Sequence, residues 1–212
     1  MKIPQSEINR LSPIVKQKFL YWDDYMHRHV KFNMPDSDIH AEAHCERVLL
    51  YALILGEDIF GDDSDALDIL AHASIFHDTR RLDEYLDTGH GARAAVYYEQ
   101  FCKDSCDISF HPESACLMRY HDLDDSVGQE AITKNFGADA DRVLKLYAIF
   151  KDSDALDRWR LGSHGLDPRF LRTDKAKSMT EYSRRIVVET MPPQLLQDIE
   201  EAVNRLMSPN DK

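Results

Sequence analysis

Apolar and polar residues follow one another along this chain with the period of an α-helix. Apolar positions recur at spacings of three and four, and no short segment alternates them in the β-branched pattern of a strand. Breaks fall at segments that contain glycine or proline, of which there are eight each. The pattern predicts helices at residues 6–31, 39–56, 64–78, 90–103, 112–121, 126–135, 139–160, 174–190 and 193–207. We therefore expect an all-α fold, a compact multi-helix bundle.

The chain of 212 residues is long enough for one domain with its own hydrophobic core. Residues that carry chemistry are concentrated at 38–162, which we interpret as the core of that domain. We interpret 1–37 as an N-terminal helical extension and 163–212 as C-terminal helices that pack on the core. The extensions are alternatively an oligomer surface, and a homodimer is one arrangement that the sequence leaves open.

The charge balance is acidic, with 26 Lys and Arg against 38 Asp and Glu and a net charge of -12. A field of this sign repels a nucleic-acid duplex and an anionic membrane, so neither is an expected partner. A small anionic substrate then needs a local source of positive charge, such as a metal ion.

Nothing in the sequence predicts insertion into a membrane or export. The first ten residues lack the apolar segment of a signal peptide, and the longest apolar run, Val48 to Leu55, is too short to span a bilayer. The four cysteines form no CxxC pair and no zinc-knuckle spacing. We therefore expect a cytoplasmic protein with reduced cysteines.

Histidines and aspartates lie on the apolar faces of five predicted helices. His44 shares a face with Val48, and His77 ends the face that begins at Leu67, with Asp78 directly after it. The same spacing places three further residues on apolar faces: His90, His121 and Asp154. Asp152 lies roughly 200° around the helix from Asp154, so the two are not expected to point inward together.

Burial of these groups needs an explanation, because a buried carboxylate without a partner costs several kcal/mol. For any single histidine, a hydrogen bond to a backbone carbonyl is a sufficient explanation. For the whole set, a shared cation satisfies all the groups at once, and mixed His and Asp ligands suit a divalent ion. The coincidence of five such faces favours a metal site.

Three runs in this set resemble the H…HD…D signature of the HD superfamily. They are His44-Cys-Glu-Arg47-Val48, Phe76-His77-Asp78, and the segment from Lys151 to Asp157 with Asp154 within it. The resemblance covers roughly residues 38 to 162. Members of that superfamily are all-helical, metal-dependent phosphohydrolases, so the resemblance implies an HD-type bundle that cleaves a phosphomonoester or a phosphodiester, with nucleotides among the candidate substrates.

The resemblance also implies roles for individual residues. The ligands of the metal would be His44, His77, Asp78 and Asp154, with His90 and His121 as ligands of a second ion in members that hold two. The cofactor would be one or two divalent ions of Mn, Mg, Fe, Ni or Co. Asp78 would then bridge the two ions, while His90 or His121 is alternatively a proton donor to the leaving oxygen.

Recognition of a phosphorylated substrate should depend on local cations. Arg80 and Arg81 follow the His-Asp pair, Arg93 lies in the first turn after a glycine-flanked helix start, and Lys151 is close to Asp154 in sequence. Arg158 and Arg160 also flank Asp154, and His40, one turn before His44, is expected at the mouth of the pocket. For each of these, a solvated charge or a salt bridge is the alternative interpretation.

The segment from Thr79 to Glu84 departs from known subfamily patterns. It lacks the HDxxED and HDxxE motifs and a Gly-Tyr-Pro extension, so the substrate stays open. Two other functions use the same ligands. One is a di-iron oxygenase, which some helical HD proteins are, and the other is a non-catalytic HD domain that binds a metal or senses a ligand.

Overall fold

The computed structural model describes residues 2–105 and 107–207. Within these ranges every regular element is a helix, which confirms the predicted all-α fold. The α-helices are α1 (Gln5–Ile8), α2 (Pro13–His29), α3 (Glu42–Phe60), α4 (Ser64–Phe76), α5 (His90–Asp104), α6 (Pro112–Tyr120), α7 (Asp125–Phe136), α8 (Ala140–Leu156), α9 (Asp174–Ser178), α10 (Thr180–Thr190) and α11 (Pro193–Met207). Short 3-10 helices lie at η1 (Gly137–Asp139), η2 (Asp157–Leu161) and η3 (Pro168–Phe170).

The hairpin of α3 and α4 forms the centre of the bundle. Both helices are buried along most of their length, and α3 packs against α2, α4 and α8. The predicted end of α3 at Gly56 is wrong, because the helix continues to Phe60. A Cβ at Gly56 would lie only 2.7 Å from Leu70 Cδ1 and 2.9 Å from Leu67 Cδ2, so glycine here permits close packing of the two helices.

The predicted helix at 6–31 is interrupted. Ser12 caps α2 by accepting a hydrogen bond from Val15 N, and Pro13 begins the helix. Proline lacks the N–H that a continuous helix would need at this position, and its fixed φ suits the first turn. The chain before it forms only the single turn of α1.

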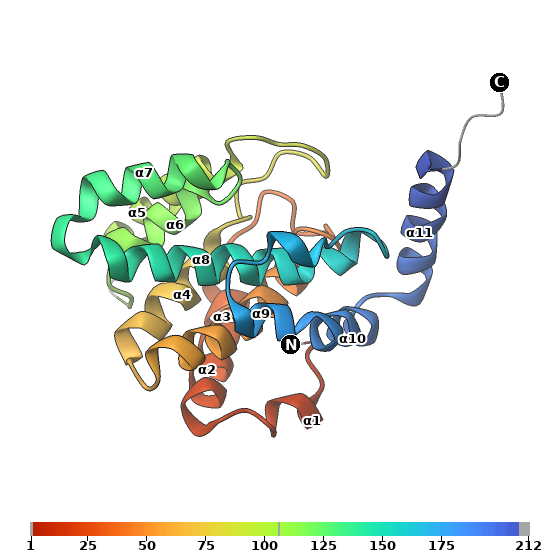
Figure 1. Ribbon diagram of the computed structural model, residues 1–212, viewed down its shortest axis with the longest axis horizontal. Helices are drawn as coiled ribbons and strands as arrows, with labels where there is room; N and C mark the ends of the chain where they lie inside the picture. The colour runs from red at the N-terminus through yellow and green to blue at the C-terminus, as the bar shows by residue number, and fades with distance from the viewer. Residues whose placement is uncertain (1, 106, 208–212) are drawn as a thin grey trace.

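Helix α8 crosses the molecule, with α7 beside it and the pair α5–α6 behind α7 (Figure 1). Helices α9 and α10 cover the other end of α3 and α8. At the right-hand edge of Figure 1, α11 stands apart from the bundle; it contacts η2, and its Glu200 accepts hydrogen bonds from Ser163. Helices α9 and α10 thus contact the central helices α3 and α8, whereas α11 lies against η2.

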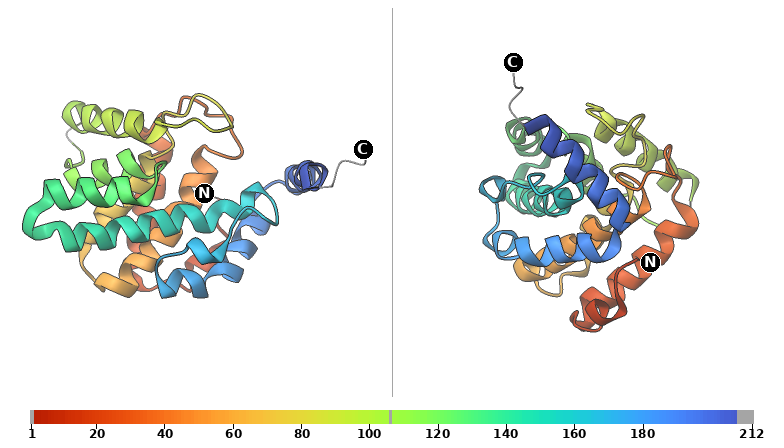
Figure 2. Two further views of the ribbon diagram at one scale, coloured as in Figure 1. Left: turned by 45° about the horizontal axis from the view of Figure 1, so that its top comes forward. Right: turned by 90° about the vertical axis from the view of Figure 1, so that its right-hand side faces the viewer.

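Two loops, 30–41 and 77–89, lie side by side at one edge of the bundle (Figures 1 and 2). Asn33 N donates to Thr79 O at 2.9 Å, and Ser37 Oγ donates to Glu84 Oε2 at 3.0 Å. The ends of α4 and α6 and the starts of α3 and α5 meet beside these loops, which is where the histidines converge. No helix in the described ranges has the length and apolarity that a membrane span requires.

Candidate metal centre

The sequence-predicted ligands come from helix ends that meet at one point. His44 lies in the first turn of α3, and His77 and Asp78 follow the last turn of α4. His90 begins α5, and His121 follows α6 directly. Asp154 belongs to the last turn of α8.

Every one of the four imidazoles is held through Nδ1. His44 Nδ1 lies 2.7 Å from Asp157 Oδ2, and the other three Nδ1 atoms lie on backbone carbonyls. These contacts are His77 to Ser74 O at 2.8 Å, His90 to Asp87 O at 2.7 Å and His121 to Met118 O at 2.7 Å. A carbonyl oxygen only accepts, so Nδ1 carries the proton and Nε2 presents a lone pair. This is the arrangement of histidines that bind metals.

The Nε2 atoms face one another in two pairs. His44 Nε2 is 3.0 Å from His77 Nε2, and His90 Nε2 is 2.9 Å from His121 Nε2. Two nitrogens bound to one ion at about 2.1 Å and at right angles lie about 3 Å apart. Neutral imidazoles with Nδ1 protons cannot hydrogen-bond to each other in this way, so the geometry fits a cation near each pair.

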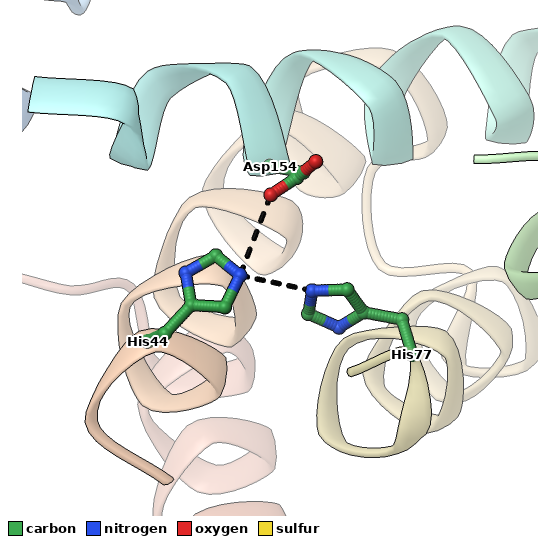
Figure 3. Close-up of side chains that lie close together, drawn as sticks. All are labelled: His44, His77 and Asp154. Atoms are coloured by element: carbon green, nitrogen blue, oxygen red, sulfur yellow. Dashed lines mark hydrogen bonds and ion pairs between the residues drawn. The ribbon is translucent and has the colours of Figure 1, made fainter. Parts of the chain in front are cut away.

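Carboxylates complete both groups. Asp154 Oδ1 is 3.4 Å from His44 Nε2, and Figure 3 shows these two residues and His77 pointing to a common centre. Asp78 lies between the pairs, with Oδ2 3.6 Å from His44 Nε2 and Oδ1 3.0 Å from His90 Nε2. Two overlapping sets of potential ligands result, His44–His77–Asp154 and His77–Asp78–His121. Buried His and Asp clusters that can hold a metal ion are therefore present.

Asp78 Oδ1 provides an independent test of the fit. It is buried and has no hydrogen-bond donor of suitable geometry, although His77, His90 and His121 surround it within 3.9 Å. A buried carboxylate oxygen without a partner is costly. An ion between Asp78 and the histidines would supply the missing positive charge.

The electrostatics keep three of the candidate ligands, His77, Asp78 and Asp154, in the form that binds a cation. Burial lowers the pKa of His77 to about 3, so this imidazole is neutral at pH 7. Burial alone would raise the pKa of Asp78, but His77 and the other histidines around the carboxylate outweigh burial and hold this pKa well below its ordinary value. The pKa of Asp154 is also well below its ordinary value, because His44 outweighs the effect of burial.

A buried ion pair supports His44 from behind. Asp157 accepts bonds from Arg47 Nε at 2.5 Å and Arg47 Nη2 at 3.0 Å while it binds His44 Nδ1. All three side chains are almost completely buried. The sequence placed Asp157 one turn after Asp154 but did not reveal this contact. Arg47 therefore orients a ligand through Asp157.

A cavity of about 440 Å³ opens beside the cluster. Asp78, His90, His121 and Asp154 are part of its wall. The side chain of Asp154 is 28% exposed, whereas those of His44 and His77 are fully buried. A small molecule in the cavity would therefore reach the candidate ions from the side of Asp154 and the His90–His121 pair.

Two of the arginines predicted to bind substrate lie outside this wall. Arg80 donates to Lys31 O at 2.7 Å, and its guanidinium lies 3.3 Å from the ring centroid of Tyr97. Arg93 donates to Arg80 O at 3.1 Å and to Asp87 Oδ2 at 2.5 Å. Both side chains hold neighbouring segments together, and neither lines the cavity.

Arg81 and Lys151 do line the cavity, but most of their donors are occupied. Arg81 bonds to the carbonyls of Asp83 and Tyr85, and Lys151 bonds to the carbonyls of His121 and Leu123. These bonds shape the wall. Each side chain still contributes positive charge to the cavity.

Two further residues of the wall carry contacts that helical periodicity does not reveal. Asp122 accepts a hydrogen bond from Gly89 N at 2.5 Å, so the glycine-flanked start of α5 is occupied by a carboxylate of this chain. His40 Nδ1 lies 3.2 Å from Asp78 Oδ2, deeper than the expected position at the pocket mouth. In the sequence, the only signal for a role of Asp122 is that it directly follows His121.

Comparisons with protein-family models, with curated proteins and with solved structures find nothing that matches this chain.

Proposed function

We propose that this protein is a metal-dependent phosphohydrolase of the HD type that cleaves a phosphoester with water. The observation that carries the proposal is the pairing of Nε2 atoms around Asp78 at the wall of a cavity. This arrangement supports one ion at His44, His77 and Asp154 and a second at His90 and His121, with Asp78 shared.

A bound divalent ion lowers the pKa of water toward neutrality and neutralises charge on a phosphoryl group. The side chains of this protein would hold the ions in place. Asp78 lies between the two histidine pairs and would be the ligand shared by ions held there, while His40 Nδ1 contacts Asp78 Oδ2. Asp154 reaches the cavity and completes the first ligand set.

His90 and His121 are better suited to binding a cation than to donating a proton. The proton of each ring is on Nδ1 and is bonded to a backbone carbonyl, and each Nε2 faces the centre. Neither ring then has a proton to give to a leaving oxygen while it binds an ion. The proposed role of both residues is therefore that of ligands.

The ligand set favours particular metals. Imidazole nitrogen suits iron, nickel and related ions, whereas Mg²⁺ prefers oxygen ligands. Four imidazoles with two carboxylates therefore favour Mn²⁺, Fe²⁺, Co²⁺ or Ni²⁺ over Mg²⁺.

Space for the rest of a substrate adjoins the centre. A second cavity of about 590 Å³ shares His121, Lys151, Asp154 and Arg158 with the first. A phosphoryl group beside Asp154 would thus have its leaving group directed toward the segment 164–172. Polar residues predominate in both walls, which suits a hydrophilic leaving group such as a sugar or a nucleoside.

The four imidazoles also favour one second candidate, a di-iron oxygenase with the same ligands. Such an enzyme would consume dioxygen and release no phosphate. The cationic side chains in the cavity wall, Arg81, Lys151, Arg158 and Arg160, offset the acidic residues there and, together with bound ions, would accommodate the anionic substrate of a phosphohydrolase.

The test is phosphate release from a panel of phosphomonoesters, phosphodiesters and nucleotides by protein loaded in turn with Mn²⁺, Fe²⁺, Co²⁺ and Ni²⁺. We expect hydrolysis of at least one class, reduced at least 100-fold in Asp78→Asn, and unchanged in Asp24→Asn on the exposed face of α2. Oxygen consumption without hydrolysis would establish the oxygenase instead. Metal binding without either activity would leave a non-catalytic domain.

A further inference from the structure

Arg160 is a buried arginine in the wall of the cavity, at the end of η2. Only 4% of the residue is exposed. Its Nε donates to Ile39 O at 2.9 Å, which fixes the guanidinium beside the loop before α3. Its Nη1 is buried and has no hydrogen-bond partner among the described residues, and the nearest carboxylate oxygen, Asp157 Oδ2, is 3.7 Å away.

This shortage of acceptors is unusual for a guanidinium. Arginine carries five N–H donors, and a buried donor without an acceptor costs about 1–3 kcal/mol. Arg47, which is buried against the same Asp157, bonds through Nε, Nη1 and Nη2. Arg160, in contrast, lies 3.7 Å from Asp157 Oδ2, too far for a hydrogen bond, and its hydrogen bond to Ile39 O is made through Nε. A ligand with oxygen acceptors would satisfy it.

The other cations of the wall do not have this free capacity in a buried position. Arg81 and Lys151 are bonded to backbone carbonyls of the wall itself. Arg158 is exposed, so water satisfies its remaining donors. Among the cavity-lining cations, Arg160 thus combines burial with unmet donors.

The charge of the cavity makes the position of Arg160 significant. Asp78, Glu84, Asp87, Asp122 and Asp154 line it, together with four cationic side chains. The side chains alone therefore do not attract an anion, and an anion needs the ions and a cation placed close to them. Arg160 and Asp154 line the same cavity, so the guanidinium faces the space beside this candidate ligand.

We propose that Arg160 binds the phosphoryl group of the substrate. Its Nη atoms donate to oxygens of that group while other oxygens of the group face the ions beside Asp154 and Asp78. A planar guanidinium matches two oxygens of a tetrahedral phosphate, which is why it recognises this group better than a lysine does. The inference rests on the proposed function for the identity of the anion as a phosphoryl group.

The experiment measures the binding of inorganic phosphate to metal-loaded protein by calorimetry. We expect the dissociation constant for phosphate to rise at least tenfold in Arg160→Gln and less in Arg160→Lys, which keeps the charge. Arg28→Gln, an exposed arginine of α2, should bind phosphate as the wild type does. Metal content and circular dichroism must be the same in all four proteins.

A second measurement protects the test against loss of structure, because Arg160 also contacts Ile39. Phosphate titrated into wild type loaded with a diamagnetic ion such as Zn²⁺ should shift one buried arginine side-chain resonance that is absent from the spectrum of Arg160→Lys. Unchanged phosphate affinity in both variants, or a titration that shifts no arginine resonance, overturns the assignment.

The outcomes separate this inference from the proposed function. If the wild type binds phosphate through Arg160 but hydrolyses no phosphoester, the proposed function is contradicted and the role of Arg160 in anion binding is retained. If Arg160→Lys and Arg160→Gln hydrolyse the substrate with the KM of the wild type, the proposed function is retained and the role of Arg160 in anion binding is contradicted.

Discussion

At the scale of single residues, periodicity predicted which face carries each side chain but not what that side chain contacts. The six expected ligands do converge, because an apolar face directs a polar group toward the interior. Arg80 lies on Tyr97 instead of in the cavity, and Asp152, on the far side of α8 from Asp154, is buried against Arg172. Such pairings depend on segments far away in sequence.

The contact between Asp157 and His44 leads to a prediction about metal affinity. Asp157→Asn weakens the hold on His44 Nδ1 and leaves the buried Arg47 without a full counter-charge. We expect metal affinity to fall about 10–100-fold, as is typical when the supporting partner of a ligand is lost. Competition with a chromogenic chelator measures this affinity.

An exposed carboxylate is the control for that prediction. Asp174→Asn, in an exposed residue at the start of α9, should leave metal affinity unchanged. Wild-type affinity in Asp157→Asn would show that the orientation of His44 does not depend on this contact.

His72 is a buried histidine outside the candidate metal centre, and it predicts how stability depends on pH. Its Nδ1 bonds to Tyr98 Oη at 2.8 Å, and its ring packs on Trp22. Burial lowers its pKa to about 3, from an ordinary value of 6.5. Between these values the unfolded chain takes up a proton that the folded chain does not. The contribution of His72 to stability is therefore complete above pH 6.5 and is lost as the pH falls toward 3.

Urea unfolding at pH 7, 6, 5 and 4 tests this dependence. Below pH 6 each such histidine removes about 1.4 kcal/mol of stability per pH unit. As the pH falls below 6, the unfolding free energy of His72→Gln should decrease less steeply than that of the wild type, by about 1.4 kcal/mol per pH unit. Parallel curves for the two proteins would mean that His72 takes up its proton in the folded state.

At the scale of helices, the positions of most elements were predictable and their ends were less so. Breaks at proline and at solvent-exposed glycine follow from local chemistry. Continuation of α3 through Gly56 follows from packing against Leu67 and Leu70, which no local pattern reveals. The convergence of helix ends on one centre also depends on tertiary packing, so periodicity alone could not establish it.

At Gly91, beside the centre, helices α5 and α6 approach each other closely. A Cβ there would lie 2.2 Å from Met118 O, the carbonyl that holds His121 Nδ1, and 2.7 Å from that nitrogen itself. Gly91→Ala should therefore separate α5 from α6. We expect a loss of about 1–3 kcal/mol in unfolding free energy and loss of the second metal ion.

Urea unfolding and metal analysis by mass spectrometry check this prediction. Val96→Ala, on the exposed face of α5, is the control and should change neither quantity. Two bound ions and wild-type stability in Gly91→Ala would contradict the proposed place of His121 in the centre.

At the scale of the whole molecule, metal binding and stability should be linked. The centre gathers two carboxylates and four imidazoles that face one another in the interior of a chain with a net charge of -12. Ions that bind only the folded state stabilise it by about 4 kcal/mol at a free concentration 1,000 times the dissociation constant. For a chain of this size, such a change corresponds to roughly 8–16 °C in Tm.

Thermal unfolding with and without a chelator measures this linkage. We expect the chelator to lower Tm by that amount and excess Mn²⁺ or Co²⁺ to restore it. His44→Ala, which removes a ligand of the first ion, should have a lower Tm than the wild type and a smaller response to both treatments. A Tm of the wild type that is insensitive to chelation would show that the centre binds no ion tightly.

The central claim is that distant side chains share cations in the interior, and anomalous X-ray diffraction from metal-loaded crystals tests it most directly. The account predicts a peak within about 2.0–2.3 Å of the Nε2 atoms of His44 and His77 and of Asp154, with a second beside His90 and His121. Metal-loaded crystals in which the only anomalous peaks lie elsewhere, with these groups bonded to each other or to water, would contradict it.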